Sequence, residues 1–177
     1  MKKFSLMLII VISVLLSGCG KTTDKMTVKD AYNGDKLTIG VIGELPKVIE
    51  GNVLFQQLQF DELKEMTENP GMDAIIITKE NLEEASEGTY AAIYQASTIP
   101  VFFIQSEKSY VPFIREDLSY QDAAFMDDLT YITGIQYQDG SLKTWGFGLY
   151  NDTVSEENIQ IAYTQLFETI DELKQAE

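Results

Sequence analysis

Histidine is absent from the chain, and cysteine occurs once among its 177 residues. Without histidine, the usual Ser-His and Cys-His nucleophile pairs, most catalytic zinc sites and the usual pH switch are excluded. With one cysteine, no disulfide can form within the chain, so stability must come from core packing. The sequence carries no catalytic signature, and we expect no catalytic residues, no metal and no cofactor.

Basic residues are also scarce. The chain has 13 Lys and Arg against 28 Asp and Glu, a formal net charge of −15. Such a surface repels nucleic acid and anionic lipid headgroups, so we expect no nucleic-acid partner and no polybasic membrane patch. Solubility is the simplest explanation of the acidity, with a cationic partner or surface divalent ions as the alternative. The hydrophobic share of 45% is that of a globular protein with a real core.

The first nineteen residues are organised like a secretory signal. Lys2 and Lys3 precede an apolar run of about 13 residues, 4–16, and small residues follow it. The run is shorter than the roughly 20 residues that span a bilayer as a helix, which disfavours an uncut anchor. Its end, Leu16-Ser17-Gly18-Cys19, resembles the lipobox of bacterial lipoproteins. An ordinary secretory signal with a cysteine near its cleavage point is the alternative.

The resemblance implies that residues 1–18 are cleaved and that Cys19, the first residue of the mature protein, carries lipid. Its acyl chains would hold the protein in the lipid bilayer, at the extracytoplasmic face of the cell membrane, since two chains anchor stably where one is marginal. Cleavage removes Lys2 and Lys3 and leaves 159 of the 177 residues, with 11 basic against 28 acidic side chains and a formal charge of −17.

The mature chain divides into two parts by composition. Residues 19–35 comprise the lipidated cysteine and a polar, flexible tether, which at roughly 3.3 to 3.6 Å per residue could extend about 50 Å. Residues 36–177 are predicted to form a single α/β domain.

Short apolar, β-branched runs predict buried strands at 37–42, 73–78 and 99–104. A further strand is predicted at 53–60 and a short helix at 61–67. Between the second and third buried strands, residues at helical spacing predict one face of a helix: Leu82, Ala85, Thr89, Ala92, Ile93 and Ala96. Gly88 weakens this predicted helix in its middle. Strand, helix and strand form a βαβ unit, which implies a parallel pair with a right-handed crossover.

Residues 36–106 resemble one lobe of the sugar-binding proteins of bacterial transport systems. The resemblance rests on the strand Asp73 to Ile77 and on Ile99-Pro100-Val101, which opens the next strand. Those receptors close two lobes around a ligand, whereas this chain has room for one. In open parallel sheets, ligands bind beyond the carboxyl ends of the strands. The candidate ligand-binding residues are therefore those that follow the three strands: Gly43, Glu44, Thr78, Lys79, Gln105 and Ser106.

In the C-terminal part of the chain, the sequence predicts a loop at 105–117, a helix at 120–128 and then a hairpin. Strands at 129–138 and 141–150 flank Asp139-Gly140, a strong hairpin signal. Counting back from a two-residue turn predicts these pairs: Gln136 with Lys143, Gly134 with Trp145, Thr133 with Gly146 and Tyr131 with Gly148. Trp145 and Phe147 then share a core face with Ile132, and the other face carries Tyr131, Tyr137 and Tyr150.

A last helix follows the hairpin. Thr153 or Ser155 is its predicted cap, with Thr153 and Glu156 fitting a capping box. Its apolar stripe, which we expect to dock on the sheet rather than on another helix, comprises Ile159, Tyr163, Leu166, Ile170 and Leu173. The predicted fold is thus a small three-layer Rossmann-like α/β domain with a partly parallel sheet, a C-terminal β-hairpin and a C-terminal helix.

The sequence favours a non-catalytic, membrane-anchored lipoprotein with an accessory or protein-binding role in the cell envelope, and an envelope protein as its partner. A single-lobe small-solute-binding lipoprotein is the second hypothesis. A carboxylate-dependent envelope hydrolase is the third, with three adjacent acid pairs to inspect: Glu116-Asp117, Asp127-Asp128 and Glu156-Glu157. Adjacent acids point in different directions, so these pairs do not by themselves form a catalytic dyad.

The lipobox predicts the behaviour of one variant. In Cys19→Ala the thiol that would carry the lipid is gone, so we expect the protein to leave the membrane fraction. Fractionation of cells by sedimentation, with immunodetection of a C-terminal tag, measures this. Equal membrane retention of Cys19→Ala and wild type would refute the lipid anchor.

Overall fold

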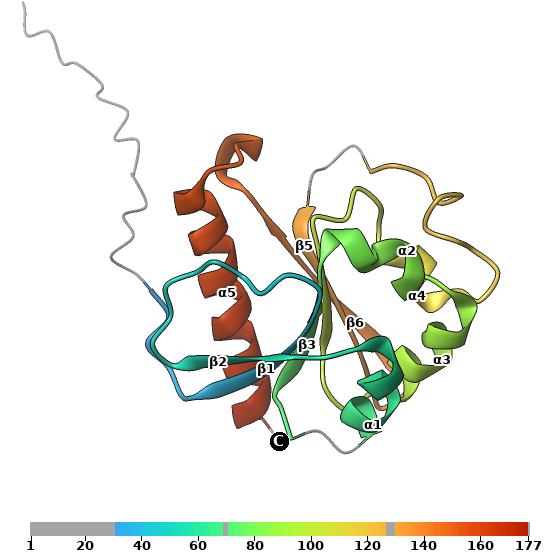
Figure 1. Cartoon of the computed structure of the whole chain (residues 1–177), viewed down its shortest axis with the longest axis horizontal. Helices are drawn as coiled ribbons and strands as arrows, with labels where there is room; N and C mark the ends of the chain where they lie inside the picture. The colour runs from blue at the N-terminus through green and yellow to red at the C-terminus, as the bar shows by residue number, and fades with distance from the viewer. Residues whose placement is uncertain (1–30, 69–70, 127–129, 177) are drawn as a thin grey trace, which may run out of the picture.

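The computed structural model describes residues 31–68, 71–126 and 130–176 of the chain. The predicted signal peptide and Cys19 lie outside these ranges. None of the helices in the described part is long and apolar enough to span a bilayer. The fold is the predicted three-layer α/β domain, with one mixed sheet between two helical layers (Figure 1).

The sheet contains six strands. In chain order they are β1 (Leu37–Ile42), β2 (Val53–Gln57), β3 (Ala74–Ile77), β4 (Val101–Ile104), β5 (Thr130–Gln138) and β6 (Ser141–Gly148). Their order in space is β2-β1-β3-β4-β5-β6. The first four are parallel to one another, whereas β5 is antiparallel to β4 and forms the predicted hairpin with β6.

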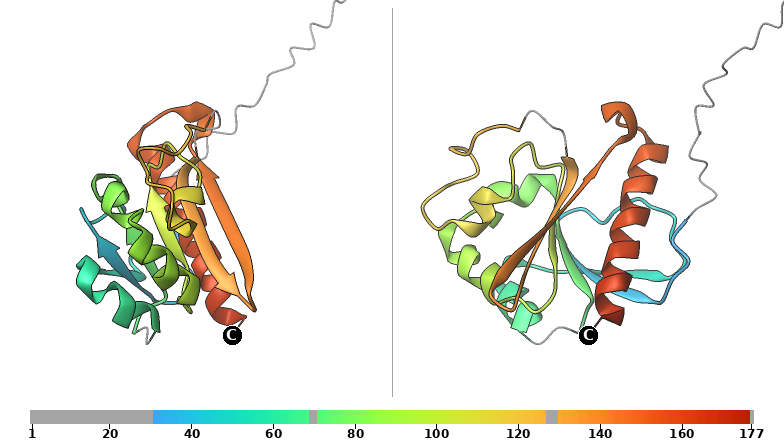
Figure 2. Two further views of the ribbon diagram at one scale, coloured as in Figure 1. Left: turned by 90° about the vertical axis from the view of Figure 1, so that its right-hand side faces the viewer. Right: turned by 180° about the vertical axis from the view of Figure 1, so that it is seen from behind.

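The helices are short except for the last. They are η2 (Phe60–Glu62), α1 (Leu63–Glu68), η3 (Lys79–Asn81), α2 (Leu82–Ala85), α3 (Gly88–Ala96), α4 (Val111–Ile114), η4 (Tyr150–Asp152) and α5 (Glu156–Gln175). Helices α1 to α4 lie on one side of the sheet and α5 lies on the other (Figures 1 and 2). The C-terminal helix therefore docks on its own sheet, as its apolar stripe predicts.

The two faces of the sheet form two separate cores. Alternate side chains of β3 contribute to each, with Ala74 and Ile76 facing the α5 side and Ile75 and Ile77 facing the α1–α4 side. On the second side Phe103 stacks on Phe113 of α4, with ring centroids 3.7 Å apart. Both rings are fully buried.

The predicted helix at 82–96 is in fact two helices. The chain breaks at Ser86-Glu87, and Gly88 opens α3 instead of kinking one long helix. A Cβ at Gly88 would lie 2.5 Å from the carbonyl oxygen of Glu116, so the next loop packs directly on this backbone. The break changes the helical phase, and the buried residues of α3 are Ala91 and Tyr94 rather than the predicted Thr89, Ala92 and Ala96.

The helix predicted at 120–128 is wrong in its described part. Residues 120–126 form turns that fold back on the preceding loop, where Lys108 and Phe125 form an isolated β-bridge. The Nζ of buried Lys108 donates to the carbonyl of Ala123 at 2.5 Å and lies 3.4 Å from the Phe125 ring centroid. Contacts across the loop thus override the local helical pattern.

The packed domain begins before the predicted boundary at Lys36. Tyr32, assigned to the tether by composition, is buried in the α5-side core with its ring 6.0 Å from that of Phe167. Its hydroxyl donates to the carbonyl of Asp35 at 2.6 Å. An isolated aromatic residue in a polar stretch gave no periodic pattern from which this contact could be inferred.

The cap of α5 is Ser155, one of the two predicted residues. Its side chain accepts a hydrogen bond from the backbone N–H of Asn158, while the Thr153 hydroxyl donates to the carbonyl of Asn151. The capping box of Thr153 with Glu156 is therefore wrong, because the helix begins two residues later than that motif requires.

We expect truncation of the stacked pair to be costly. Phe103→Ala removes a fully buried ring from close packing, which should lower the free energy of unfolding by about 3–5 kcal/mol. Leu54→Ala, at a side chain 63% exposed on β2, is the matched control and should change it by less than about 0.5 kcal/mol. Urea unfolding followed by circular dichroism measures both. Similar losses for the two variants would contradict this description of the core.

Candidate functional site

The predicted ligand-binding residues converge at one edge of the sheet. The carboxyl ends of β1, β3, β4 and β6 meet there with the amino end of β5. Two adjoining hollows lie at this edge, with volumes of about 160 and 210 Å³. They share Lys79, Gln105 and Tyr131 in their linings. We call the two together the carboxyl-edge groove.

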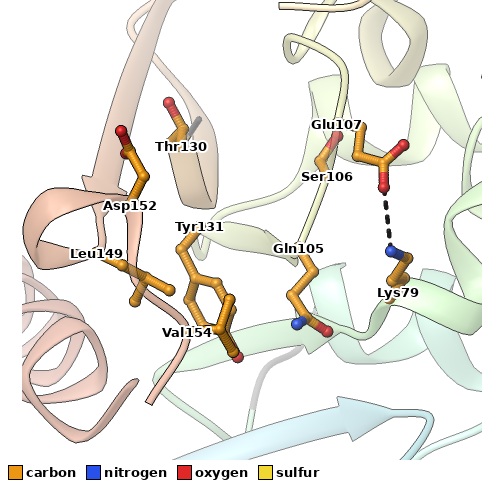
Figure 3. A pocket seen from close by; sticks show the side chains of 9 residues that line it. All are labelled: Lys79, Gln105, Ser106, Glu107, Thr130, Tyr131, Leu149, Asp152 and Val154. Atoms are coloured by element: carbon orange, nitrogen blue, oxygen red, sulfur yellow. Dashed lines mark hydrogen bonds and ion pairs between the residues drawn. The ribbon is translucent and has the colours of Figure 1, made fainter. Parts of the chain in front are cut away.

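The first hollow is lined by apolar and polar side chains together. Tyr131, Leu149 and Val154 lie on one side of it, and Gln105 and Lys79 lie on the other (Figure 3). Its remaining lining residues are Ser106, Glu107, Thr130 and Asp152. Val154 is 69% exposed and stands at the rim. The hollow therefore offers an apolar surface to solvent beside hydrogen-bonding groups.

The second hollow continues the groove over helix α5. Its floor includes Ile159 and Tyr163 of that helix, and its outer wall is the loop that follows β1. Leu45 of this loop is 43% exposed at the rim. The other lining residues are Glu44, Pro46, Lys47, Thr78, Glu80 and Ile104. Burial raises the pKa of the Tyr163 phenol, which stays neutral in the floor.

A β-bulge places Tyr131 in the groove. The register shifts by one residue between Thr130 and Ile132, so Thr130, not Tyr131, pairs with Gly148. The other three predicted hairpin pairs are confirmed. The extra residue turns the Tyr131 ring onto the α5 side, where it packs against the core that contains Ile132. The prediction that Tyr131 shares the opposite face with Tyr137 is therefore wrong.

Backbone strain accompanies this bulge. The N–H of Gln105 donates to the carbonyl of Tyr131 at 2.6 Å, and Gln105 has a φ of 55°. Asp152, across the first hollow, also lies in the left-handed region with a φ of 50°. Non-glycine residues seldom adopt this conformation, and such strain concentrates at functional sites.

The loop after β1 is fixed by Gly43 and Glu80. Gly43 has a φ of 112°, and a Cβ there would lie 1.7 Å from the Thr78 hydroxyl. The Glu80 carboxylate accepts from that hydroxyl at 2.7 Å and from the N–H of Glu44 at 2.9 Å. Burial acts to raise the pKa of Glu80, but these hydrogen bonds, with one from its own N–H, outweigh it and lower the pKa. The carboxylate thus holds the rim of the second hollow.

Charged side chains of the groove mostly pair with each other. Lys79 Nζ lies 3.1 Å from a Glu107 oxygen, and Lys47 Nζ lies 2.7 Å from a Glu44 oxygen. These pairs are exposed and contribute little to stability. With Glu80 and Asp152, the lining holds four acids against two lysines, a small acidic excess beside its apolar residues.

Glu80 does not have the pKa of a general acid. A general acid needs a raised pKa, whereas that of Glu80 is lowered. Burial raises the pKa of Glu50, but this carboxylate accepts from Gln160 and Thr164 of α5 and lines neither hollow. Among the described residues, no group of three or more Cys, Asp or Glu side chains is placed to hold a metal ion.

The carboxylate pairs flagged in the sequence lie away from the groove. Asp117 is exposed and pairs with Arg115 at 2.6 Å, which lowers the pKa of that carboxyl. Glu156 and Glu157 occupy the first turn of α5. The pair Asp127-Asp128 lies outside the described residues.

Five of the six predicted ligand-binding residues line the groove: Glu44, Thr78, Lys79, Gln105 and Ser106. Gly43 lines a separate hollow beside β2 and acts on the groove only through the loop it begins. Sequence reasoning missed Leu149, Asp152 and Val154 as lining residues. The one available signal was the apolar Val154 standing alone in a polar stretch before a helix cap.

Comparison with known proteins adds no identification. No protein-family model matches the chain, and no match is found among curated proteins or solved structures.

The charge of Glu80 should stabilise the folded state in a pH-dependent way. Its pKa is lower folded than unfolded, so the stabilisation is present above the unfolded pKa and is lost as pH falls through the folded pKa. We expect wild type to melt at a higher temperature than Glu80→Gln at about pH 7, and the gap to close as pH falls through the folded pKa of Glu80, where its carboxylate becomes protonated. Glu65→Gln, on the exposed face of α1, is the control in calorimetry. A gap independent of pH would show that charge plays no part.

Proposed function

We propose that the chain is a non-catalytic, extracytoplasmic lipoprotein that binds an envelope protein through the carboxyl-edge groove. Acyl chains on Cys19 would hold it at the membrane, as the lipobox predicts. The observation that carries the binding role is the apolar rim of the groove, where Val154 lines the first hollow, Leu45 lines the second and Tyr131 lines both. Exposed apolar side chains gathered around a hollow are characteristic of protein-binding surfaces.

The size of the hollows supports a polypeptide segment as the ligand. Pockets that enclose a small molecule usually measure about 300–1,000 Å³ and bury most of its surface. The hollows here are about 160 and 210 Å³ and both are open to solvent. A cavity of roughly 150 Å³ accommodates one benzene-sized group. Each hollow thus has room for one apolar side chain of a segment that crosses the groove.

Side-chain substitutions at the rim test this proposal. We expect Leu45→Asp combined with Val154→Asp to reduce recovery of the partner at least tenfold in a crosslinking pull-down from intact cells, because two carboxylates would be buried against apolar groups. Leu54→Asp is the control, since the exposure of Leu54 lies between those of Leu45 and Val154 but the residue lies on β2, away from the groove.

Cys19→Ala serves as the unanchored control in the same experiment. A partner recovered equally with the rim variant and with wild type would refute the groove as its binding site. Equal recovery of the partner with Cys19→Ala and with wild type would show that binding does not require the lipid.

Small-solute binding is the second candidate function, favoured by the convergence of Lys79, Gln105 and Ser106 on one hollow. A solute that binds the folded state raises the melting temperature. A thermal-shift screen of sugars, amino acids and peptides distinguishes the two. A shift with a sugar or amino acid, lost in Gln105→Ala, would favour the solute; a shift confined to apolar peptides would favour the protein partner.

A further inference from the structure

In the described part of the chain, no strand pairs with the outer edge of β6. This strand is the last of the sheet, eight residues long, or about 27 Å at 3.4 Å per residue. The β5–β6 hairpin runs along the border of the molecule (Figure 2, left). Five of the eight residues of β6 are exposed and the other three are half-buried, so solvent reaches the strand.

The register of the hairpin determines which backbone groups point outward. The Asp139-Gly140 turn makes Gln138 and Ser141 its closing, hydrogen-bonded pair, and such pairs alternate with non-hydrogen-bonded ones. Ser141, Lys143 and Trp145 therefore bond to β5. The N–H and C=O groups of Leu142, Thr144 and Gly146 face the open edge.

This edge carries few of the features that usually keep a strand from pairing: one lysine, and a bulge that lies on the inner strand β5, opposite the last residues of β6. Protected edges carry proline, several charges, a bulge or a covering segment. The strand β6 has no proline and one charged residue, Lys143. None of the chain's 28 acidic residues lies on it, although the net charge is −15. The opposite edge strand, β2, is shorter, with five residues.

We propose that β6 pairs antiparallel with β6 of a second copy of the chain, about a two-fold axis at Thr144. A two-fold axis perpendicular to the sheet places the α5 side of both copies on the same face of the joined sheet. Side chains alternate between the two faces along a strand, so a residue of one copy must face a partner residue whose number differs from its own by an even number. Centring the axis on Thr144 also brings the outward-facing backbone groups of the two strands together. The two sheets then form one continuous sheet.

The side chains are self-complementary in this register. Leu142 faces the partner's Gly146, so its side chain lies over bare backbone. Lys143 faces the partner's Trp145, a half-buried ring on which its chain can pack and its ammonium can make a cation–π contact. Thr144 faces the partner's Thr144, a favourable cross-strand pair. No acid faces another acid, and no two lysines oppose each other.

Cysteine crosslinking in intact cells tests the pairing on the full chain. We expect Thr144→Cys, treated with a short bismaleimide, to give a band at twice the chain mass. Wild type reports any background from Cys19. Leu54→Cys, on the opposite edge, and Ser141→Cys, whose two copies would lie about 20 Å apart in this register, should give at least tenfold less.

Three results would overturn the proposal. These are the absence of a Thr144→Cys dimer, an equal yield from Leu54→Cys, and a Thr144→Cys adduct with a different protein in place of the dimer. The last would assign the edge to a foreign strand.

Fluorescence of Trp145, the only tryptophan, gives a second measurement. For the full chain in detergent, we expect its emission to shift to shorter wavelength as protein concentration rises, because pairing buries the ring. Thr144→Pro removes an outward N–H without breaking the β5–β6 ladder, so it should fold but show no shift. Emission that is independent of concentration in wild type, with a monomeric mass by light scattering, would refute the dimer.

Discussion

The structure depends on the burial of β3, whose side chains project into both cores. Ala74 and Ile76 point toward α5, Ile75 and Ile77 point toward the other helical layer, and all four are fully buried. A strand of this kind needs a layer on each face. The chain supplies one layer from its middle and the other from its last twenty helical residues, α5. Because no disulfide can form within the chain, this double burial is the main source of stability.

The groove arises where the sheet changes from parallel to antiparallel. Strands β3 and β4 end at the edge where β5 begins, so Lys79, Gln105 and Tyr131 come from three different elements and meet in one place. The bulge at Tyr131 and the left-handed Gln105 are joined by one hydrogen bond. Together they turn an aromatic ring from the hairpin toward α5, where it lines both hollows of the groove.

The sequence predicts those parts of the fold that rest on local pattern. Apolar runs identified β1, β3 and β4, and Asp139-Gly140 identified the hairpin with most of its register. The carboxyl-end rule for parallel sheets then brought five candidate residues to the groove. The bulge at Tyr131 was beyond prediction, because one inserted residue leaves the alternation of its neighbours unchanged. The turns at 120–126 were missed for a different reason: the contact of Lys108 with Phe125 joins segments whose own sequences favour other structures.

The two proposed surfaces meet at the end of β6. Gly148 is the last residue of this strand, and Leu149, the next, lines the first hollow of the groove. Pairing of β6 with a second copy would restrict the backbone that positions Leu149 in the groove. Any free energy by which dimerisation favours binding in the groove must equal that by which binding favours dimerisation. Antiparallel pairing also directs the two grooves toward opposite ends of the shared sheet. A partner held at one groove would therefore not reach the other, and a second partner molecule would be needed to occupy both.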